Sequence, residues 1–309
     1  MMSIQIINLI KRILIFSVFL IIGYTLLLFL FGSVLKPKHL PNLVYKVGHN
    51  YLRLQEVRQT SNVDLLFLGS SHAYRGFDTR IFSASNYKAF NLGSSSQTPI
   101  QTLILIDRYL KKLNPKLVVF EVNPMVFASD GVESGLDLIV NDNNDLHSLK
   151  MVFNQKNIKL HNTYLYTLVN GIFNDTVYVK NKAYKKGGYV AKLKPAYFNG
   201  EEQDKTLITF NENQIKSFET ILRRLNKNCI NYILVQAPVT SLKYNSYSNI
   251  KAFNSLMASY GDYYNYNEVL NLNDTIDFYD SHHLNQTGVN IFNKAFINFL
   301  DNNFQDLKE

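Results

Sequence analysis

Four short segments of the 309-residue chain carry side chains that could perform chemistry. Three of them follow apolar runs: GSSH at 69–72, NLG at 91–93 and EVNP at 121–124. The fourth, DSHH at 280–283, precedes the last helix-like stretch. A serine can attack an acyl carbon when a histidine takes its proton, and that histidine needs a carboxylate to fix its tautomer. Asp280 and His283 offer both groups from one turn, and Ser71 is the candidate nucleophile.

Each segment taken alone also has an ordinary structural interpretation. A serine pair after a strand more often caps a helix than attacks a substrate. His72 and His282 fit structural roles, in the first turn of a helix and in a polar loop. Asp280, His282 and His283 could bind zinc, but no further His or Cys lies at a recognisable spacing, so we expect no metal. The glycine pair at 187–188 follows no strand and is not a phosphate loop, so we expect no cofactor.

The elements that would position these segments alternate between buried strands and amphipathic helices. Five apolar runs predict strands: 64–69, 88–93, 116–122, 231–237 and, more weakly, 263–266. Apolar residues recur at helical spacing in three stretches: 100–113, 215–225 and 291–299. Strands that are apolar throughout and alternate with helices indicate a parallel sheet covered on both faces. The predicted fold class is therefore α/β, a three-layer α/β/α domain of the flavodoxin-like type, with sites at the carboxyl ends of its strands.

The alternation stops between residues 125 and 209. This stretch carries Asn and Tyr, a Lys-Lys-Gly-Gly turn at 185–188, and no sustained period. Long stretches of this kind in α/β enzymes are often insertions that cover or shape a site. We expect one domain over 62–309 with an insertion at about 125–209, preceded at 36–61 by a stalk with a short helix.

From about residue 64 to residue 299 the chain resembles the SGNH, or GDSL-like, hydrolase superfamily. FLGSSHAYRGFD at 67–78 matches the first of four family blocks and puts Ser71 in the nucleophile position. Ser70 replaces the usual Asp, as in the teichoic-acid D-alanylation and alginate acetylation relatives. The second block is matched at 91–93, and the third at 115–124, where the usual Gly-x-Asn-Asp has become Glu-Val-Asn-Pro. DSHHLN at 280–285 matches the fourth and selects His283 over His282.

The resemblance implies serine-dependent acyl transfer with Ser71, Asp280 and His283 as the triad. The backbone N–H groups of Ser71 and Gly93 and the side chain of Asn123 would form the oxyanion hole. Membrane-tethered relatives often add or remove acetyl or D-alanyl esters on envelope polysaccharides, several of them with a multi-pass membrane O-acyltransferase. An esterase or O-acyltransferase acting on a cell-envelope glycan is thus implied. Two alternatives stay open: a lipase or thioesterase of the same fold, and a non-catalytic accessory protein that binds glycan or its membrane partner.

An uncharged segment from Ile13 to Leu35 indicates the compartment. As a helix it would be roughly 34 Å long, enough to cross a bilayer core. The alternative is a cleaved signal peptide, but its apolar region would be shorter, and 32–34 (GSV) fits a cleavage site poorly. Short basic tails usually stay in the cytoplasm. We expect a cytoplasmic tail at 1–12, a transmembrane anchor at 13–35, and a catalytic domain in the periplasm or at the surface of a bacterium.

Composition adds few constraints. The formal charge of +8 comes from 32 Lys and Arg against 24 Asp and Glu, but the basic residues are scattered, so we expect no nucleic-acid partner. Cys229 is the only cysteine, which excludes an intrachain disulfide, and its place before an apolar run predicts burial. The tyrosines from 244 to 266 could form a sugar-stacking face, although half-buried packing is the more usual role.

Overall fold

The computed structural model describes residues 4–33, 48–173, 181–192 and 196–308. Its centre is a sheet of five strands: β1 (Leu65–Leu68), β2 (Ala89–Asn91), β3 (Leu117–Glu121), β4 (Asn231–Gln236) and β5 (Tyr263–Asn265). The order is β2-β1-β3-β4-β5, and every neighbouring pair is parallel. This is the flavodoxin-like order. The predicted fold class and all five predicted strands are confirmed.

Helices cover both faces of the sheet. Successive side chains of a strand point to opposite faces, and here the side chains on both faces are apolar and must be buried. One layer packs on Leu66, Val118 and Leu234 and consists of α2 (Gly48–Val57), α5 (Pro99–Leu113), α10 (Glu212–Lys227) and α12 (Ile250–Ala258). The other packs on Phe67, Val119 and Val235 and includes α3 (Ser71–Gly76), α4 (Thr79–Ala84) and α14 (Gln286–Asn303). Short elements complete the fold: α11 (Ser241–Ser246), α13 (Tyr266–Val269) and η2 (Gln305–Leu307). The three predicted helices correspond to α5, α10 and α14.

The expected insertion at about 125–209 is largely helical in its first half. It contains α6 (Pro124–Ala128), α7 (Val132–Asn141), α8 (Leu146–Gln155) and α9 (Ile158–Phe173). The sequence shows no period there because small or polar residues such as Ser134 and Ser148 are buried while Ile158 and Leu165 are exposed. Arg108 of α5 fixes the α7–α8 turn through hydrogen bonds of 2.7 Å to Asp142 and Asp145. The insertion therefore packs against α5 and α2 and is part of the domain.

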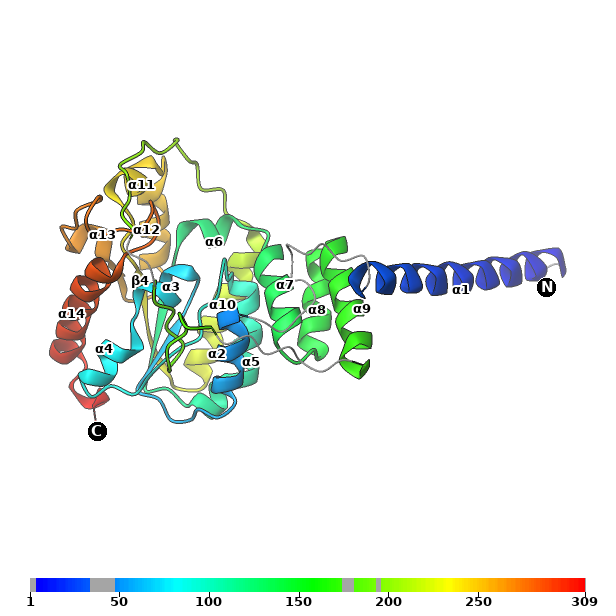
Figure 1. Ribbon diagram of the computed structural model, residues 1–309, viewed down its shortest axis with the longest axis horizontal. Coiled ribbons are helices and arrows are strands. Elements are labelled where there is room, and N and C mark those ends of the chain that lie inside the picture. Colours follow the sequence, from blue (N-terminus) through cyan, green and yellow to red (C-terminus); the bar gives the residue numbers. More distant parts are fainter. Residues whose placement is uncertain (1–3, 34–47, 174–180, 193–195, 309) are drawn as a thin grey trace.

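One helix stands outside the packed domain. Among the described residues, only α1 (Ile4–Ser33) is long and apolar enough to cross a membrane, and none of its residues is buried. It projects from the helical insertion (Figure 1). Near its end, the Tyr24 hydroxyl donates to Asn162 Oδ1 of α9 at 2.5 Å, and the rings of Phe29 and Tyr166 lie 5.3 Å apart. The last two residues of the predicted anchor lie outside the described residues.

Two further expectations concern packing. The stretch expected to be a stalk contains α2, whose Arg53 and Leu54 are buried in the domain, while residues 34–47 lie outside the described part of the chain. The prediction that Cys229 is buried is wrong: it is exposed, in the turn after α10, with a φ of 53°. Burial along β4 begins only with Ile233. Tyr247 and Tyr266 are buried, which confirms the packing interpretation of that tyrosine-rich stretch.

Candidate active site

The four segments singled out in the sequence meet at the carboxyl edge of the sheet. Ser71 is the first residue of α3, which follows β1, and Asn123 lies directly before α6, which follows β3. Gly93 follows β2, and the 280–285 loop leads into α14. Strand order reverses between β1 and β3, which is where open α/β sheets place their ligand sites.

A chain of hydrogen bonds joins Ser71, His283 and Asp280. Ser71 Oγ lies 2.8 Å from His283 Nε2, and His283 Nδ1 lies 2.9 and 3.0 Å from the two Asp280 carboxylate oxygens. With Nδ1–H donated to Asp280, Nε2 is left to accept the serine proton. Asp280 Oδ1 also accepts the backbone N–H groups of His282 and His283, at 2.9 and 2.8 Å. The carboxylate is thus held by the same loop that carries the histidine, a geometry suited to general-base activation of a serine.

The surroundings of Asp280 favour its ionised form. Partial burial acts to raise the pKa of Asp280, but the hydrogen bond from His283, the charge of that ring and the two backbone N–H groups together bring it below its ordinary value. An ionised carboxylate at this place would stabilise the imidazolium that forms when His283 takes a proton. Asn285 holds the other end of the loop as the N-cap of α14, since its Oδ1 accepts the N–H groups of Thr287 and Gly288 at 3.0 and 3.2 Å.

Two glycines allow the turn that presents Ser71. Gly69 has a φ of +136°, and a Cβ there would lie 2.8 Å from atoms of Glu121. A Cβ on Gly93 would lie 2.9 Å from the Ala73 side chain and from the Gly69 carbonyl oxygen. A side chain at either position would therefore displace the serine turn.

The predicted oxyanion donors differ in what they already bind. Asn123 is buried, and its Oδ1 accepts the Met125 N–H at 2.9 Å, which leaves the amide nitrogen on the side of His72. That nitrogen lies 3.2 Å from both ring nitrogens of His72. Because an amide carries two N–H groups, one remains for a substrate oxygen. The single N–H of Gly93 donates to Asn91 Oδ1 at 3.1 Å, so it would have to share that bond.

A second polar chain, absent from the sequence-based expectations, lies behind Ser71. Glu121 Oε2 accepts the Ser70 N–H and hydroxyl at 3.2 and 3.1 Å, and Ser70 Oγ lies 3.1 Å from His72 Nδ1. The His72 ring stacks on His283 with 5.1 Å between ring centroids. Ser70 and Glu121 are both departures from the family pattern. The occurrence of both departures in one sequence is the signal that could have revealed this chain, because two unusual residues in contact can compensate for each other.

Burial governs the charge of this second chain. It raises the pKa of Glu121 to about 8, against the opposing effect of the two Ser70 hydrogen bonds, so the carboxyl group is mostly protonated at neutral pH. Burial, followed by the charges of His283 and His282, brings the pKa of His72 below its ordinary value. Both groups are therefore uncharged near neutrality. Glu121 holds the turn that carries Ser71 through its hydrogen bonds with Ser70, and the His72 ring packs on one face of the His283 ring.

The cleft at Ser71 has a volume of about 400 Å³. Its apolar lining comes from one helix, α6, through Met125, Val126 and Ala128. The polar lining residues are Ser70, Ser71, His72, Ser96, Asn123, Ser129 and His282. No cluster of three or more His, Cys, Asp or Glu that could hold a metal lies within the described ranges.

No protein-family model matches this chain, and neither does any curated protein. Among solved structures, a GDSL-like lipase of Bacteroides thetaiotaomicron VPI-5482 is similar with a TM-score of 0.45 and 14% identity, over 82% of this chain and 98% of that one. A gut microbial diltiazem-metabolizing enzyme is similar with a TM-score of 0.27 and 13% identity, over 77% of this chain and 47% of that one. Because both scores are low, the fold is assigned from the sheet order itself, which is flavodoxin-like. The function is argued from the site.

Proposed function

We propose that the protein is a serine acyl-transfer enzyme of the SGNH type that cleaves or forms acyl esters on a cell-envelope polysaccharide. The observation that carries the proposal is the hydrogen-bonded chain from Ser71 through His283 to Asp280, with 2.8 Å between Ser71 Oγ and His283 Nε2. A serine within reach of an oriented histidine is the arrangement that nucleophilic acyl transfer requires.

The reaction would proceed in two halves. His283 Nε2 takes the hydroxyl proton as Ser71 Oγ bonds to the acyl carbon, and Asp280 stabilises the imidazolium. The oxyanion accepts hydrogen bonds from the Ser71 N–H and the free N–H of Asn123, with Gly93 as a shared donor; one such donor is typically worth about 100- to 1000-fold in rate. His283 then returns the proton to the departing hydroxyl. Water or a second hydroxyl, deprotonated by His283, takes the acyl group from Ser71.

The shape and lining of the cleft favour a small acyl group, such as acetyl, on a polar carrier. Its volume is about 400 Å³, and seven of its ten lining residues carry hydroxyl, amide or imidazole groups. Its apolar side comes from Met125, Val126 and Ala128, all on the five-residue helix α6. A lipase or thioesterase would need a longer apolar slot beside Ser71, so this alternative is less well supported.

The location belongs to the same proposal. We infer that α1 anchors the chain and that the domain lies on the extracytoplasmic side of a bacterial membrane; the support is the length and apolar character of α1. In the transferase version of the proposal, a multi-pass membrane O-acyltransferase delivers the acyl group across the bilayer. In the hydrolase version, water replaces the second hydroxyl and no such partner is needed.

A fluorophosphonate serine probe tests the proposal. Wild type should be labelled and should hydrolyse a small acetyl ester, while Ser71→Ala and His283→Ala should lose labelling and at least about 1000-fold in kcat. Ser96→Ala is the matched control, because Ser96 lines the same cleft and bonds to Glu133 rather than to a histidine. If wild type with a normal thermal unfolding transition neither labels nor hydrolyses the ester, the hydrolase version is overturned, which leaves a transferase that depends on its membrane partner or a non-catalytic accessory protein.

A further inference from the structure

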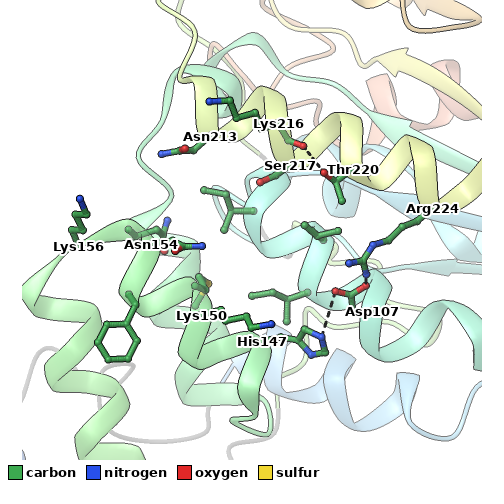
Figure 2. Close-up of a pocket in the computed structure, with 16 residues that line it drawn as sticks. Asp107, His147, Lys150, Asn154, Lys156, Asn213, Lys216, Ser217, Thr220 and Arg224 are labelled. Atoms are coloured by element: carbon green, nitrogen blue, oxygen red, sulfur yellow. Dashed lines mark hydrogen bonds and ion pairs between the residues drawn. The ribbon is translucent and has the colours of Figure 1, made fainter.

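A second and larger cleft, of about 700 Å³, lies between the helical insertion and the core. Its floor is α5, where Ile100, Leu103 and Ile104 line it; α8 forms one wall and α10 the other (Figure 2). We call it the lysine cleft, after Lys150 and Lys156 on the α8 wall. Its size is within the range of pockets that bind small molecules or short polymer segments.

The lysine cleft carries unbalanced positive charge. Neither Lys150 nor Lys156 has a carboxylate partner in the part of the chain that the structure describes. On the opposite wall, Lys216 pairs only with Glu212, one helical turn away, in an exposed contact of 3.1 Å. Exposed pairs of this kind are weak, so Lys216 remains available to a ligand.

One end of the cleft is closed by an ion-pair cluster. Asp107 on the floor bonds to Arg224, and its carboxylate lies 3.7 Å from His147 Nε2 (Figure 2). Asp107 is the single carboxylate among the lining residues, and Arg224 neutralises it. The remaining charge of the cleft is therefore positive and comes from Lys150, Lys156 and Lys216.

Uncharged polar groups and one aromatic ring also line the cleft. The side chains of Asn154, Asn213 and Ser217 line the cleft and make no hydrogen bond to any other described residue. Phe153 is 61% exposed at the rim. Amide and hydroxyl groups can pair with sugar hydroxyls, and an exposed ring offers a face against which a sugar can stack. An acyl chain lying here would leave those polar groups without partners.

The lysine cleft shares a wall with the Ser71 cleft. Gln214 Nε2 donates to the Ser129 carbonyl oxygen at 3.1 Å, and Gln214 Oε1 accepts the Ile100 N–H at 3.2 Å. Ser129 lines the Ser71 cleft and Ile100 lines the lysine cleft. The two clefts are therefore neighbours, linked through the buried side chain of Gln214.

We propose that the lysine cleft binds a segment of acidic glycan whose neighbouring acylated unit lies in the Ser71 cleft. This inference rests on the proposed function and names its substrate class. Lysine is a point charge that does not demand bidentate geometry, so carboxylate and phosphate groups on a hydroxyl-bearing chain both fit. The glycan extends past α10, and its charge, rather than the ester, supplies much of the binding.

Binding of defined tetramers to the full-length protein in detergent tests the proposal. A linear tetramer of galacturonic acid is the probe, and a linear tetramer of glucose is its neutral counterpart. We expect calorimetric titration to show the acidic tetramer bound at least about tenfold more tightly than the neutral one, and Lys150→Glu/Lys156→Glu to lose at least about tenfold of that affinity. Lys227→Glu/Lys251→Glu is the matched control, because it makes the same charge change at exposed positions outside the cleft and should bind as wild type does.

Three results would overturn the inference. They are no preference for the acidic tetramer, an equal loss of affinity in both double variants, and cleft-dependent binding of single-stranded DNA or anionic phospholipid vesicles in place of the tetramer. Hydrolysis of a small acetyl ester separates this proposal from the first one. The cleft variants should keep the wild-type rate on that ester, since Ser71 and His283 are untouched; inactivity of the wild type would count against the proposed function only.

Discussion

At the scale of single residues, His283 lies between two polar chains of opposite character. On one side Asp280 has a lowered pKa and carries a charge. On the other, His72 stacks on the same ring at 5.1 Å and is kept neutral, chiefly by burial. A charged ring at that distance would repel the imidazolium that acyl transfer requires. Burial of His72 thus keeps a second charge away from the His283 ring, while the stacked His72 ring restricts how His283 can turn.

Glu121→Gln is expected to flatten the dependence of stability on pH. The folded protein holds the Glu121 proton up to about pH 8, whereas an unfolded chain releases it near the ordinary value of 4.5. The contribution of Glu121 to the free energy of unfolding is therefore complete below that lower value and is lost as the pH rises to about 8. Glutamine has no proton to release. Urea unfolding at about pH 5 and about pH 8 should show a smaller difference in the variant than in wild type.

The control for this experiment is Glu202→Gln, which changes an exposed glutamate of the same type. It should keep the wild-type difference between the two pH values. An equal difference in wild type and in Glu121→Gln would mean that Glu121 is ionised throughout and that its carboxyl group is better solvated than its burial indicates.

At the scale of elements, the site depends on how closely two strand ends approach. The loops after β1 and β2 meet where Gly93 lies against Ala73 and the Gly69 carbonyl, and this contact sets the position of the first turn of α3. Gly76, in the same helix, has ordinary surroundings, since a Cβ there would lie 3.7 Å from Phe292. Comparison of alanine substitutions at Gly93 and Gly76 therefore separates an effect on the turn that carries Ser71 from the general effect of adding a methyl group.

Gly93→Ala should displace the turn and impair catalysis beyond its effect on stability. Overpacking of this kind typically costs about 1–3 kcal/mol. We expect a lowered thermal unfolding midpoint and, at a temperature where the variant is fully folded, a reduced kcat for a small ester. Gly76→Ala should retain both, because alanine fits the helix without a clash. Full activity in a folded Gly93→Ala variant would show that the loop relaxes without moving Ser71.

At the scale of the whole molecule, the helical insertion links the anchor to the domain. α9 contacts α1 through Tyr24 and Phe29, and α8 of the same insertion forms a wall of the lysine cleft (Figure 1). If α1 spans a bilayer, the insertion lies between the membrane and the sheet. The thickness of the insertion then determines how far both clefts lie from the bilayer surface.

Deletion of residues 1–33 should release the protein from membranes without loss of ester hydrolysis. No residue of α1 is buried in the domain, so the core keeps its contacts. We expect the full chain to stay in the membrane pellet through salt and alkaline washes and to leave it only in detergent, whereas the truncated chain is soluble and active. If expression of the full sequence yields a soluble product whose amino terminus begins after α1, the segment is a cleaved signal peptide and the anchor is contradicted.

Local patterns in the sequence were enough to predict the strands, three long helices and the three side chains of the candidate triad. Strand and helix periods are short-range properties, so all five strands and the helices α5, α10 and α14 could be predicted. The choice of Ser71, Asp280 and His283 came from motif spacing, and the structure brings these three side chains together. The helices α7, α8 and α9 of the insertion were missed because several of their buried positions are polar or small and some of their apolar positions are exposed.

Contacts between residues far apart in the sequence became known from the packed structure alone. The contact between Ser70 and Glu121 joins residues 51 positions apart, and the lysine cleft joins α8 to α10 across α5. Neither leaves a periodic trace, because each side chain is unremarkable within its own helix or strand. Cys229 was misplaced for a related reason: burial depends on where the chain turns before β4, which apolar content alone does not specify. Contacts of this kind arise from the packing of whole elements, and the packing also gives His72 and Glu121 their altered pKa values.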